Sequence, residues 1–206
     1  DVIVNVVDAS GGTNAEGEPV DIGTHDPIED VDFIEEEMDL WLAGIVDRNW
    51  EGIERKSRSP DFDMDDALSD MLTGFGAGPA DVQAVLREMA YPADPKNWTD
   101  EDRETLARLV RERTKPIVVV ANKMDVAPEE NVEKLLALDK PVIPATAEGE
   151  LALRKGAEAG VVDYDPGDAD FEILGDVTDA QRDRLQGLRD AMTEYGGTGV
   201  QSAIDY

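Results

Sequence analysis

The alternation of apolar and polar positions divides the chain into strand-like runs and helical stretches. The run from Val2 to Val7 is typical of a buried strand, and Ile117–Val120 and Pro141–Pro144 repeat that pattern further along. Apolar residues spaced by three and four predict helices that begin at Pro128 and at about Glu148. Strands that alternate with helices predict an α/β fold with a parallel sheet and right-handed crossovers.

The long stretch between the first two strands has a helical pattern throughout. Asp26-Pro27-Ile28-Glu29 is a typical helix start, with an Asp cap, Pro in the first position and Glu three residues after the cap. The apolar residues that follow recur at alternating spacings, which predicts a helix of about five turns; they are Val31, Ile34, Met38, Trp41 and Ile45. We interpret this stripe as the core of a helical lobe, with a partner-binding surface as the alternative.

These patterns predict three parts. Residues 26–113 form a helical lobe inserted into an α/β part made of residues 1–25 and 114–160. Residues 161–206 form a C-terminal helical extension, in which an acidic loop precedes a capped helix from Thr178 to Tyr195 that stops at Gly196-Gly197.

Charge is the strongest signal in the composition. The chain carries 48 acidic and 19 basic residues, a net charge of −29. Without a basic stripe, direct nucleic-acid binding by this segment is disfavoured. An evenly acidic surface favours a protein that works in concentrated salt, so we expect a halophilic source. The sequence has no cysteine, no signal peptide and no membrane-spanning apolar run, which fits a cytoplasmic protein without membrane partners.

Candidate chemistry appears where the second strand ends. Asn122-Lys123-Met124-Asp125 follows a buried strand, at the carboxyl edge where ligands bind to parallel sheets. The Asp125 carboxylate can accept hydrogen bonds from the ring N–H and the exocyclic amine of guanine, a donor pair that adenine lacks. Asn122 can hold the loop and reach the imidazole edge of the base, and the stem of Lys123 can cover its face. The pattern therefore predicts a guanine-nucleotide site.

A second motif follows the third strand. Thr146-Ala147-Glu148 lies where guanine-binding proteins place a Ser/Thr-Ala-x loop, whose alanine N–H donates to the guanine O6. The two motifs occur in the right order, each at a strand end, and support each other.

These motifs and the residues around them resemble a known family. The stretches "DVIVNVVDAS", "GTHDPIEDVDFIEEEMDLW", "KPIVVVANKMD" and "IPATAEGELALRKG" resemble the Obg-like YchF subfamily of P-loop GTPases, in its archaeal and, given the charge, haloarchaeal branch. The resemblance implies that residues 1–25 and 114–160 are part of a G domain, that the lobe is its insertion, and that a TGS domain follows Tyr206. It also implies GTP or GDP as ligand, Mg²⁺ as cofactor, and ribosomes or the translation machinery as partner.

One part of the family pattern is missing. A phosphate loop requires G-x-x-x-x-G-K-[ST], and the dipeptide Gly-Lys does not occur in this sequence. We therefore expect a sequence truncated at both ends, with the phosphate and Mg²⁺ contacts upstream, and no catalytic or metal-binding residue within these 206.

Other candidate residues have weaker patterns. Asp8-x-x-Gly has the form of a magnesium-linked switch motif, but loop capping is the simpler interpretation. His25, the sole histidine, is expected to be structural or solvated rather than a general base. Asp61, Asp63 and Asp65 suggest an EF-hand loop, but its required Gly and closing Glu are absent.

Two functional hypotheses remain open. In the first, the chain supplies the guanine pocket of a GTPase and is inactive alone. In the second, it is a non-catalytic helical interaction module with a relic nucleotide pocket.

Overall fold

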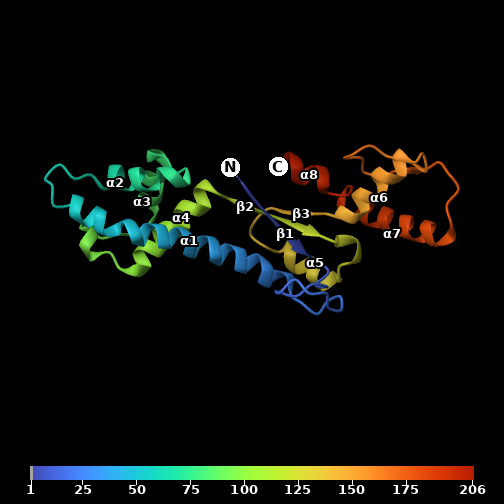
Figure 1. Ribbon diagram of the computed structural model, residues 1–206, viewed down its shortest axis with the longest axis horizontal. Coiled ribbons are helices and arrows are strands. Elements are labelled where there is room, and N and C mark those ends of the chain that lie inside the picture. The colour runs from blue at the N-terminus through green and yellow to red at the C-terminus, as the bar shows by residue number, and fades with distance from the viewer. Residues whose placement is uncertain (1) are drawn as a thin grey trace. The chain divides into compact units, whose positions relative to one another are not determined.

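The computed structural model describes residues 2–206, which form a mixed, mostly helical α/β fold (Figure 1). The strands are β1 (Ile3–Asp8), β2 (Ile117–Asn122), β3 (Val142–Pro144), β4 (Val162–Asp163) and β5 (Glu172–Ile173). The α-helices are α1 (Pro27–Lys56), α2 (Met64–Leu72), α3 (Pro79–Glu88), α4 (Asp100–Thr114), α5 (Glu129–Leu136), α6 (Ala147–Glu158), α7 (Asp179–Tyr195) and α8 (Val200–Asp205). Short 3₁₀ helices are η1 (Thr73–Phe75), η2 (Pro95–Asn97) and η3 (Met124–Val126).

The chain divides into two compact units. One, the helical unit, is made mainly of Asp32–Ile117, and the other, the sheet unit, contains Val4–Val31 and Val118–Tyr206. α1 and β2 each run from one unit into the other. All the elements between β1 and β2 in the sequence are helices, as the helical pattern predicts. They are α1, α2, η1, α3, η2 and α4. The domain limits at residues 25 and 113 stay a prediction.

The sheet has the strand order β1-β2-β3. β2 and β3 are parallel, with Val119 opposite Val142 and Ala121 opposite Pro144. At the other edge, the N–H of Ala9 donates to the carbonyl of Asn122 at 2.9 Å. All three strands therefore run in the same direction, and their carboxyl ends lie together at one end of the sheet, where a ligand site is expected.

Burial along the strands explains why the second one is the easiest to recognise. The residues from Ile117 to Ala121 in β2 are all buried, as expected of a central strand of a parallel sheet covered on both faces. In β1 burial alternates: Asn5 and Val7 are buried, whereas Val4 and Val6 are exposed. β1 thus has one covered and one open face.

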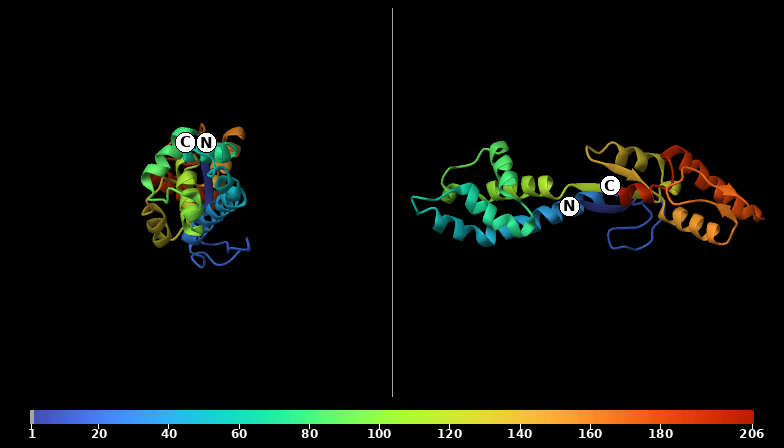
Figure 2. Two further views of the ribbon diagram at one scale, coloured as in Figure 1. Left: turned by 90° about the vertical axis from the view of Figure 1, so that its left-hand side faces the viewer. Right: turned by 90° about the horizontal axis from the view of Figure 1, so that it is seen from above.

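The helical unit has its own core, which corrects one prediction. The residues of α1 that are buried in this core are Leu42, Ala43, Val46, Trp50 and Ile53. Trp41, predicted for the buried stripe, is 53% exposed, and Ile45 is only partly buried. α1 is also longer than expected, at 30 residues. Two neighbouring stripes of α1 fit the spacing pattern, and the buried stripe is the one that shares a core with residues of α2, α3 and α4. These helices lie beside the second half of α1 (Figure 2).

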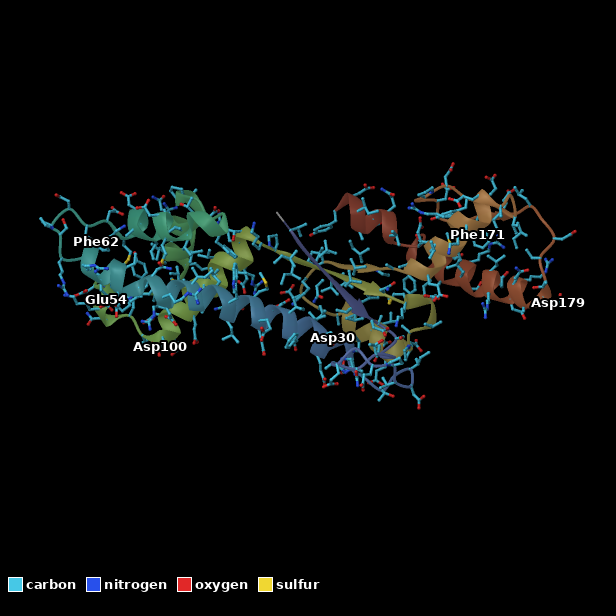
Figure 3. The ribbon with its side chains drawn as sticks, viewed as in Figure 1. Asp30, Glu54, Phe62, Asp100, Phe171 and Asp179 are labelled. Atoms are coloured by element: carbon cyan, nitrogen blue, oxygen red, sulfur yellow. The ribbon has the colours of Figure 1, made fainter. Side chains whose placement is uncertain are left out.

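A separate hydrophobic cluster lies in the C-terminal part of the sheet unit. Leu153 of α6, Leu188 and Met192 of α7, and Phe171 are buried together; Phe171 is labelled in Figure 3. The predicted acidic loop contains a short antiparallel pair, β4 with β5. Strands of two residues carry too little sequence pattern to be predicted.

Helix ends follow the predicted chemistry. The carboxylate of Asp26 accepts a hydrogen bond from the N–H of Ile28 at the start of α1. Thr178 caps α7, and Gly196, with φ of 80°, ends it. None of the helices in residues 2–206 combines the length and apolar character needed to cross a bilayer.

The burial of α1 gives a first testable prediction. Leu42 is fully buried, whereas Leu40, two residues away, is 61% exposed. We expect Leu42→Ala to lower the free energy of unfolding of the helical unit by about 2–5 kcal/mol, because it leaves a cavity in the core. Leu40→Ala, the matched control, should change it by no more than about 0.5 kcal/mol. Urea unfolding followed by circular dichroism measures both, and equal effects would contradict the burial described here.

Candidate functional site

The Asn122-Lys123-Met124-Asp125 loop leaves the sheet through a sharp backbone turn. Lys123, with φ of 64°, is the one non-glycine residue in the described chain that adopts the left-handed conformation. That conformation costs a residue with a side chain about 1–2 kcal/mol. The turn is held because Met124 is buried and its N–H donates to the carbonyl of Ala145 at 3.1 Å. Strain of this kind is typical of ligand-binding loops.

Asp125 is presented to solvent by this turn. It lies in η3, directly after the buried Met124, and is exposed. Within residues 2–206 its carboxylate has no hydrogen-bond or ion-pair partner. A free carboxylate held by a rigid backbone can accept two hydrogen bonds from a ligand.

The second predicted motif is tied directly to the first. The N–H of Ala147 donates to Oδ1 of Asn122 at 3.0 Å. The N–H of Ala145 donates to the carbonyl of Ala121 at 2.8 Å and so extends the pairing of β2 with β3. The structure therefore brings the two predicted motifs together, and Asn122 acts as the tie between them.

The start of α6 offers a free donor beside this tie. Thr146 caps the helix, because its Oγ1 accepts from the N–H of Gly149 at 3.2 Å. The N–H of Ala147 is taken by Asn122, whereas the N–H of Glu148 has no acceptor in the described part of the chain. An unpaired amide at a helix N-terminus favours a ligand atom with partial negative charge.

Lys123 reaches across to the loop that follows β1. Its Nζ donates to Oδ2 of Asp8 at 2.7 Å. Asp8 also accepts hydrogen bonds from the N–H and Oγ of Ser10, at 3.0 and 2.6 Å, and from Oγ1 of Thr13 at 2.8 Å. Asp8 thus caps its own loop, in agreement with the simpler interpretation of the Asp8-x-x-Gly pattern.

The pKa of Asp8 reflects these contacts. Burial by itself raises the pKa of this carboxyl, but the hydrogen bonds from Lys123, Ser10 and Thr13 and the charge of Lys123 together outweigh it. The pKa therefore lies below its ordinary value of 3.8. Asp8 is an anion at neutral pH, and it fixes the ammonium end of Lys123 while the stem stays half exposed.

Residues from the C-terminal segment also contact the site, and the sequence patterns did not indicate them. A small hollow beside the loops is lined by residues that include Asp125, Thr146, Tyr195 and Gly197. The carbonyl of Thr198 accepts from the N–H of Thr146 at 2.9 Å. In the sequence, Gly196-Gly197 indicated a helix stop, and nothing local pointed to a partner about 50 residues upstream.

The remaining candidates have structural partners. Nε2 of His25 lies 2.9 Å from Oδ1 of Asp30, which is labelled in Figure 3. This hydrogen bond is the main reason that the pKa of His25 is raised above 6.5. Asp63 caps α2 by accepting from the N–H of Asp66. Residues 2–206 contain no group of three or more His, Cys, Asp or Glu side chains that could hold a metal ion.

Comparisons with known proteins find GTP-binding relatives. Residues 120–206, which include both base motifs, match the family model described as "Obg-like GTPase YGR210-like, G4 motif-containing domain". The chain is also 37% identical, over its full length, to "Uncharacterized GTP-binding protein MJ1332" of Methanocaldococcus jannaschii. The homologues are GTP-binding proteins. The chain spans about half the length of the curated relatives it matches, 52% in both cases.

Solved structures confirm the fold class. The crystal structure of a GTP-binding protein from Pyrococcus horikoshii OT3 has a TM-score of 0.78 and 31% identity, covering 99% of this chain and 55% of that one. The YchF GTPase of Schizosaccharomyces pombe is also similar, at 18% identity and a TM-score of 0.38, over 78% of this chain and 46% of that one. This second likeness is too weak to carry an argument. The family model supports the Obg-like resemblance over residues 120–206, and the haloarchaeal branch stays a prediction.

The Lys123–Asp8 pair gives a prediction about pH. The pKa of Asp8 is depressed in the folded state, so its ionised form stabilises the fold above about pH 3.8, and this contribution is lost as the pH falls through the folded pKa. We expect Lys123→Met to raise the pKa of Asp8 and to lower the stability at neutral pH, with a smaller difference in acid. Carboxyl NMR titration and unfolding at several pH values measure both effects.

Lys134 provides the control for this experiment. Its Nζ donates to Oδ2 of Asp26 at 2.9 Å, and this bond is the main cause of the lowered pKa of Asp26. Lys134→Met should raise the pKa of Asp26 and leave that of Asp8 unchanged. If Lys123→Met leaves the pKa of Asp8 where it is, the ion pair does not fix the loop.

Proposed function

We propose that this chain supplies the guanine-specificity pocket of a GTP-binding protein. The observation that carries the proposal is the tie between Asn122 and Ala147, with a free Asp125 carboxylate on one side and a free Glu148 amide on the other. An acceptor and a donor held by two joined loops match the edge of a guanine base. The family match over residues 120–206 supports this assignment.

Each predicted residue has a distinct task in this proposal. Asp125 accepts hydrogen bonds from the ring N–H and the exocyclic amine of guanine. The free amide of Glu148 faces O6, with Thr146 holding the start of α6 in place. The N–H of Ala147, expected from the sequence to donate to O6, is bound to Asn122 instead. The stem of Lys123 covers a face of the base, because the pair with Asp8 fixes its far end.

Phosphate binding and hydrolysis belong, in this proposal, to residues outside these 206. The printed sequence has no Gly-Lys dipeptide, and the curated relatives are about twice as long. The Mg²⁺ contacts lie, in the same proposal, outside these residues as well, because within residues 2–206 the Asp8 carboxylate already accepts from Lys123, Ser10 and Thr13. We propose that the whole protein is a cytoplasmic P-loop GTPase of the Obg-like group, related to YchF proteins and active in translation, and that this chain alone does not hydrolyse GTP.

Base selectivity tests the proposed function. Calorimetric titration should show that the chain binds GDP and GTP in preference to ATP. Asp125→Ala should remove that preference, with a loss of at least about tenfold for GDP, because it takes away two hydrogen bonds to a charged carboxylate. Binding of GTP and ATP with equal affinity by the unchanged chain would contradict the proposal.

A second variant distinguishes a change in base recognition from a loss of folding. Asp125→Asn places an amide donor opposite the position where xanthine carries a carbonyl in place of the guanine amine. This variant should lose GDP and gain XDP, as a change of preference rather than a loss of binding. Asp139→Asn, which alters another aspartate of the sheet unit, should leave the preference for guanine unchanged.

The helical unit supports a second candidate function, an interaction module. A groove of about 410 Å³ between α1 and α4 has Leu40 and Ala43 among its lining residues, and Phe33 and Leu40 are exposed large apolar side chains of α1. Exposed apolar positions of this kind are typical of protein-binding surfaces. If the chain binds no guanine nucleotide, this surface is the remaining candidate for function.

The acidic surface predicts a dependence on salt, in line with the proposed halophilic source. With a net charge of −29, self-repulsion destabilises the compact state in dilute buffer. We expect the melting temperature to rise between about 0.1 M and 2 M KCl, since the Debye length falls from about 10 Å to below 3 Å. Sucrose, which stabilises by exclusion without screening charge, should give a smaller rise. Equal stability in dilute and molar KCl would count against a halophilic source.

A further inference from the structure

Glu150 is a buried carboxylate one turn beyond the cap of α6. It is 4% exposed, and three side chains donate to it. Oε2 accepts from the hydroxyl of Tyr164 at 2.6 Å and from Oγ1 of Thr198 at 2.5 Å, and Oε1 accepts from Nε of Arg154 at 2.5 Å. A buried charge is tolerated only when it is paired in this way, so the four groups form one fixed network.

The pKa of Glu150 agrees with this network. Burial acts to raise it, but the hydrogen bonds from Thr198, Tyr164 and Arg154 outweigh burial and lower the pKa below 4.5. The carboxylate is therefore ionised at neutral pH and accepts from all three donors.

The loop that contains Thr198 lies directly against the second base motif. Its glycines Gly196, Gly197 and Gly199 all have positive φ. A Cβ placed on Gly199 would come within 1.8 Å of the carbonyl oxygen of Pro144, so the two backbones touch. This close approach lets the carbonyl of Thr198 accept from the N–H of Thr146 at 2.9 Å.

Thr198 therefore holds the start of α6 through two bonds. Its carbonyl binds the backbone of Thr146, the cap residue, and its hydroxyl binds Glu150, one turn further along the helix. On the opposite side, Asn122 binds Ala147. The amides of Ala147 and Glu148 thus lie between two anchors, one from the first base motif and one from the C-terminal segment.

We propose that Glu150 and Thr198 are positioning residues for guanine recognition, and that they aim the free amide of Glu148 at the O6 atom of the base. Through them the segment that joins α7 to α8 sets the selectivity of the pocket for guanine. This inference rests on the proposed function, and it assigns a role to residues that do not themselves touch the nucleotide.

The test replaces the atom that the Glu148 amide would contact. In 6-thio-GDP a sulfur, a weak acceptor, replaces O6, while the groups that Asp125 would read are unchanged. The 206-residue chain should bind GDP about three- to tenfold more tightly than 6-thio-GDP, the effect of one hydrogen bond. Thr198→Val removes the hydroxyl but keeps the side-chain shape. It should reduce this ratio to near one.

The second readout separates positioning from general damage. IDP lacks the exocyclic amine, so the GDP:IDP ratio reports on Asp125 alone. It should stay within about twofold in Thr198→Val, because the Asn122-Lys123-Met124-Asp125 loop keeps its own bonds. Glu150→Gln should act like Thr198→Val, and Thr198→Ser, which retains the hydroxyl, should restore the GDP:6-thio-GDP ratio.

Thr193→Val is the matched control. Thr193 lies on α7, and its hydroxyl donates only to the carbonyl of Arg189 on an exposed face. This variant should leave both ratios unchanged. Should Thr198→Val and Thr193→Val behave alike, or should the unchanged chain fail to distinguish GDP from 6-thio-GDP, the positioning inference is wrong. A chain that also shows no preference for GDP over ADP would instead overturn the proposed function.

Discussion

The pairing of Ala145 with the end of β2 is the constraint on which the candidate site depends. The N–H of Ala145 donates to Ala121, and its carbonyl accepts from Met124, so one residue joins the strand to the loop that follows it. This double contact forces the left-handed turn at Lys123 and places Asp125 in solvent. It also fixes the distance from β2 to the start of α6, which lets Asn122 reach the N–H of Ala147. The two base motifs are therefore one rigid object, assembled by backbone hydrogen bonds.

Ion pairs add to the backbone hydrogen bonds that hold the sheet unit together. The chain has 19 basic residues for 48 acidic ones, yet cations lie at the carboxylates that organise the sheet unit. Lys123 pairs with Asp8, Lys134 with Asp26 at the start of α1, and Arg154 with Glu150. Each of these pairs connects two segments of the sheet unit or two turns of one helix. The rest of the acidic surface is unbalanced, which links the stability of the fold to the ionic strength around it.

Sequence patterns predicted the parts of this protein whose signals are local. A strand buried on both faces, such as β2, reads as a continuous apolar run, and caps such as Thr178 have their signal within four residues. Both base motifs could be placed because each directly follows a strand. The patterns failed where tertiary contacts decide. Leu42 and Trp41 are adjacent on α1, and only the packing of the other helices determines that Leu42 is buried.

The Glu150 network shows the same limit within the site itself. Glu150 looked like one acid among many, because nothing near it in sequence indicates that Tyr164 and Thr198 would surround it. Its signal was indirect: Gly196, Gly197 and Gly199 follow α7 more densely than a helix stop requires. The reason for a glycine is seen only in the structure: Gly199 lies against the carbonyl of Pro144, where a side chain would not fit.

The two outer strands of the sheet, β3 and β1, have different surroundings. The difference bears on where the proposed GTP-binding protein would bind the base and where it would bind the phosphates. At the β3 edge, the loops after the strands are tied to each other and to the C-terminal segment. β1 is the outer strand at the other edge; Val4 and Val6 are exposed on its open face, and Nδ2 of Asn5 is buried without a hydrogen-bond partner in the described residues. An apolar, open edge strand is a surface for further pairing. A parallel strand added there would end beside the Asp8 loop that Lys123 contacts, at the same carboxyl edge as the base pocket. The phosphate contacts would then lie next to the base site, and the division of base and phosphate recognition would follow the order of strands in one sheet.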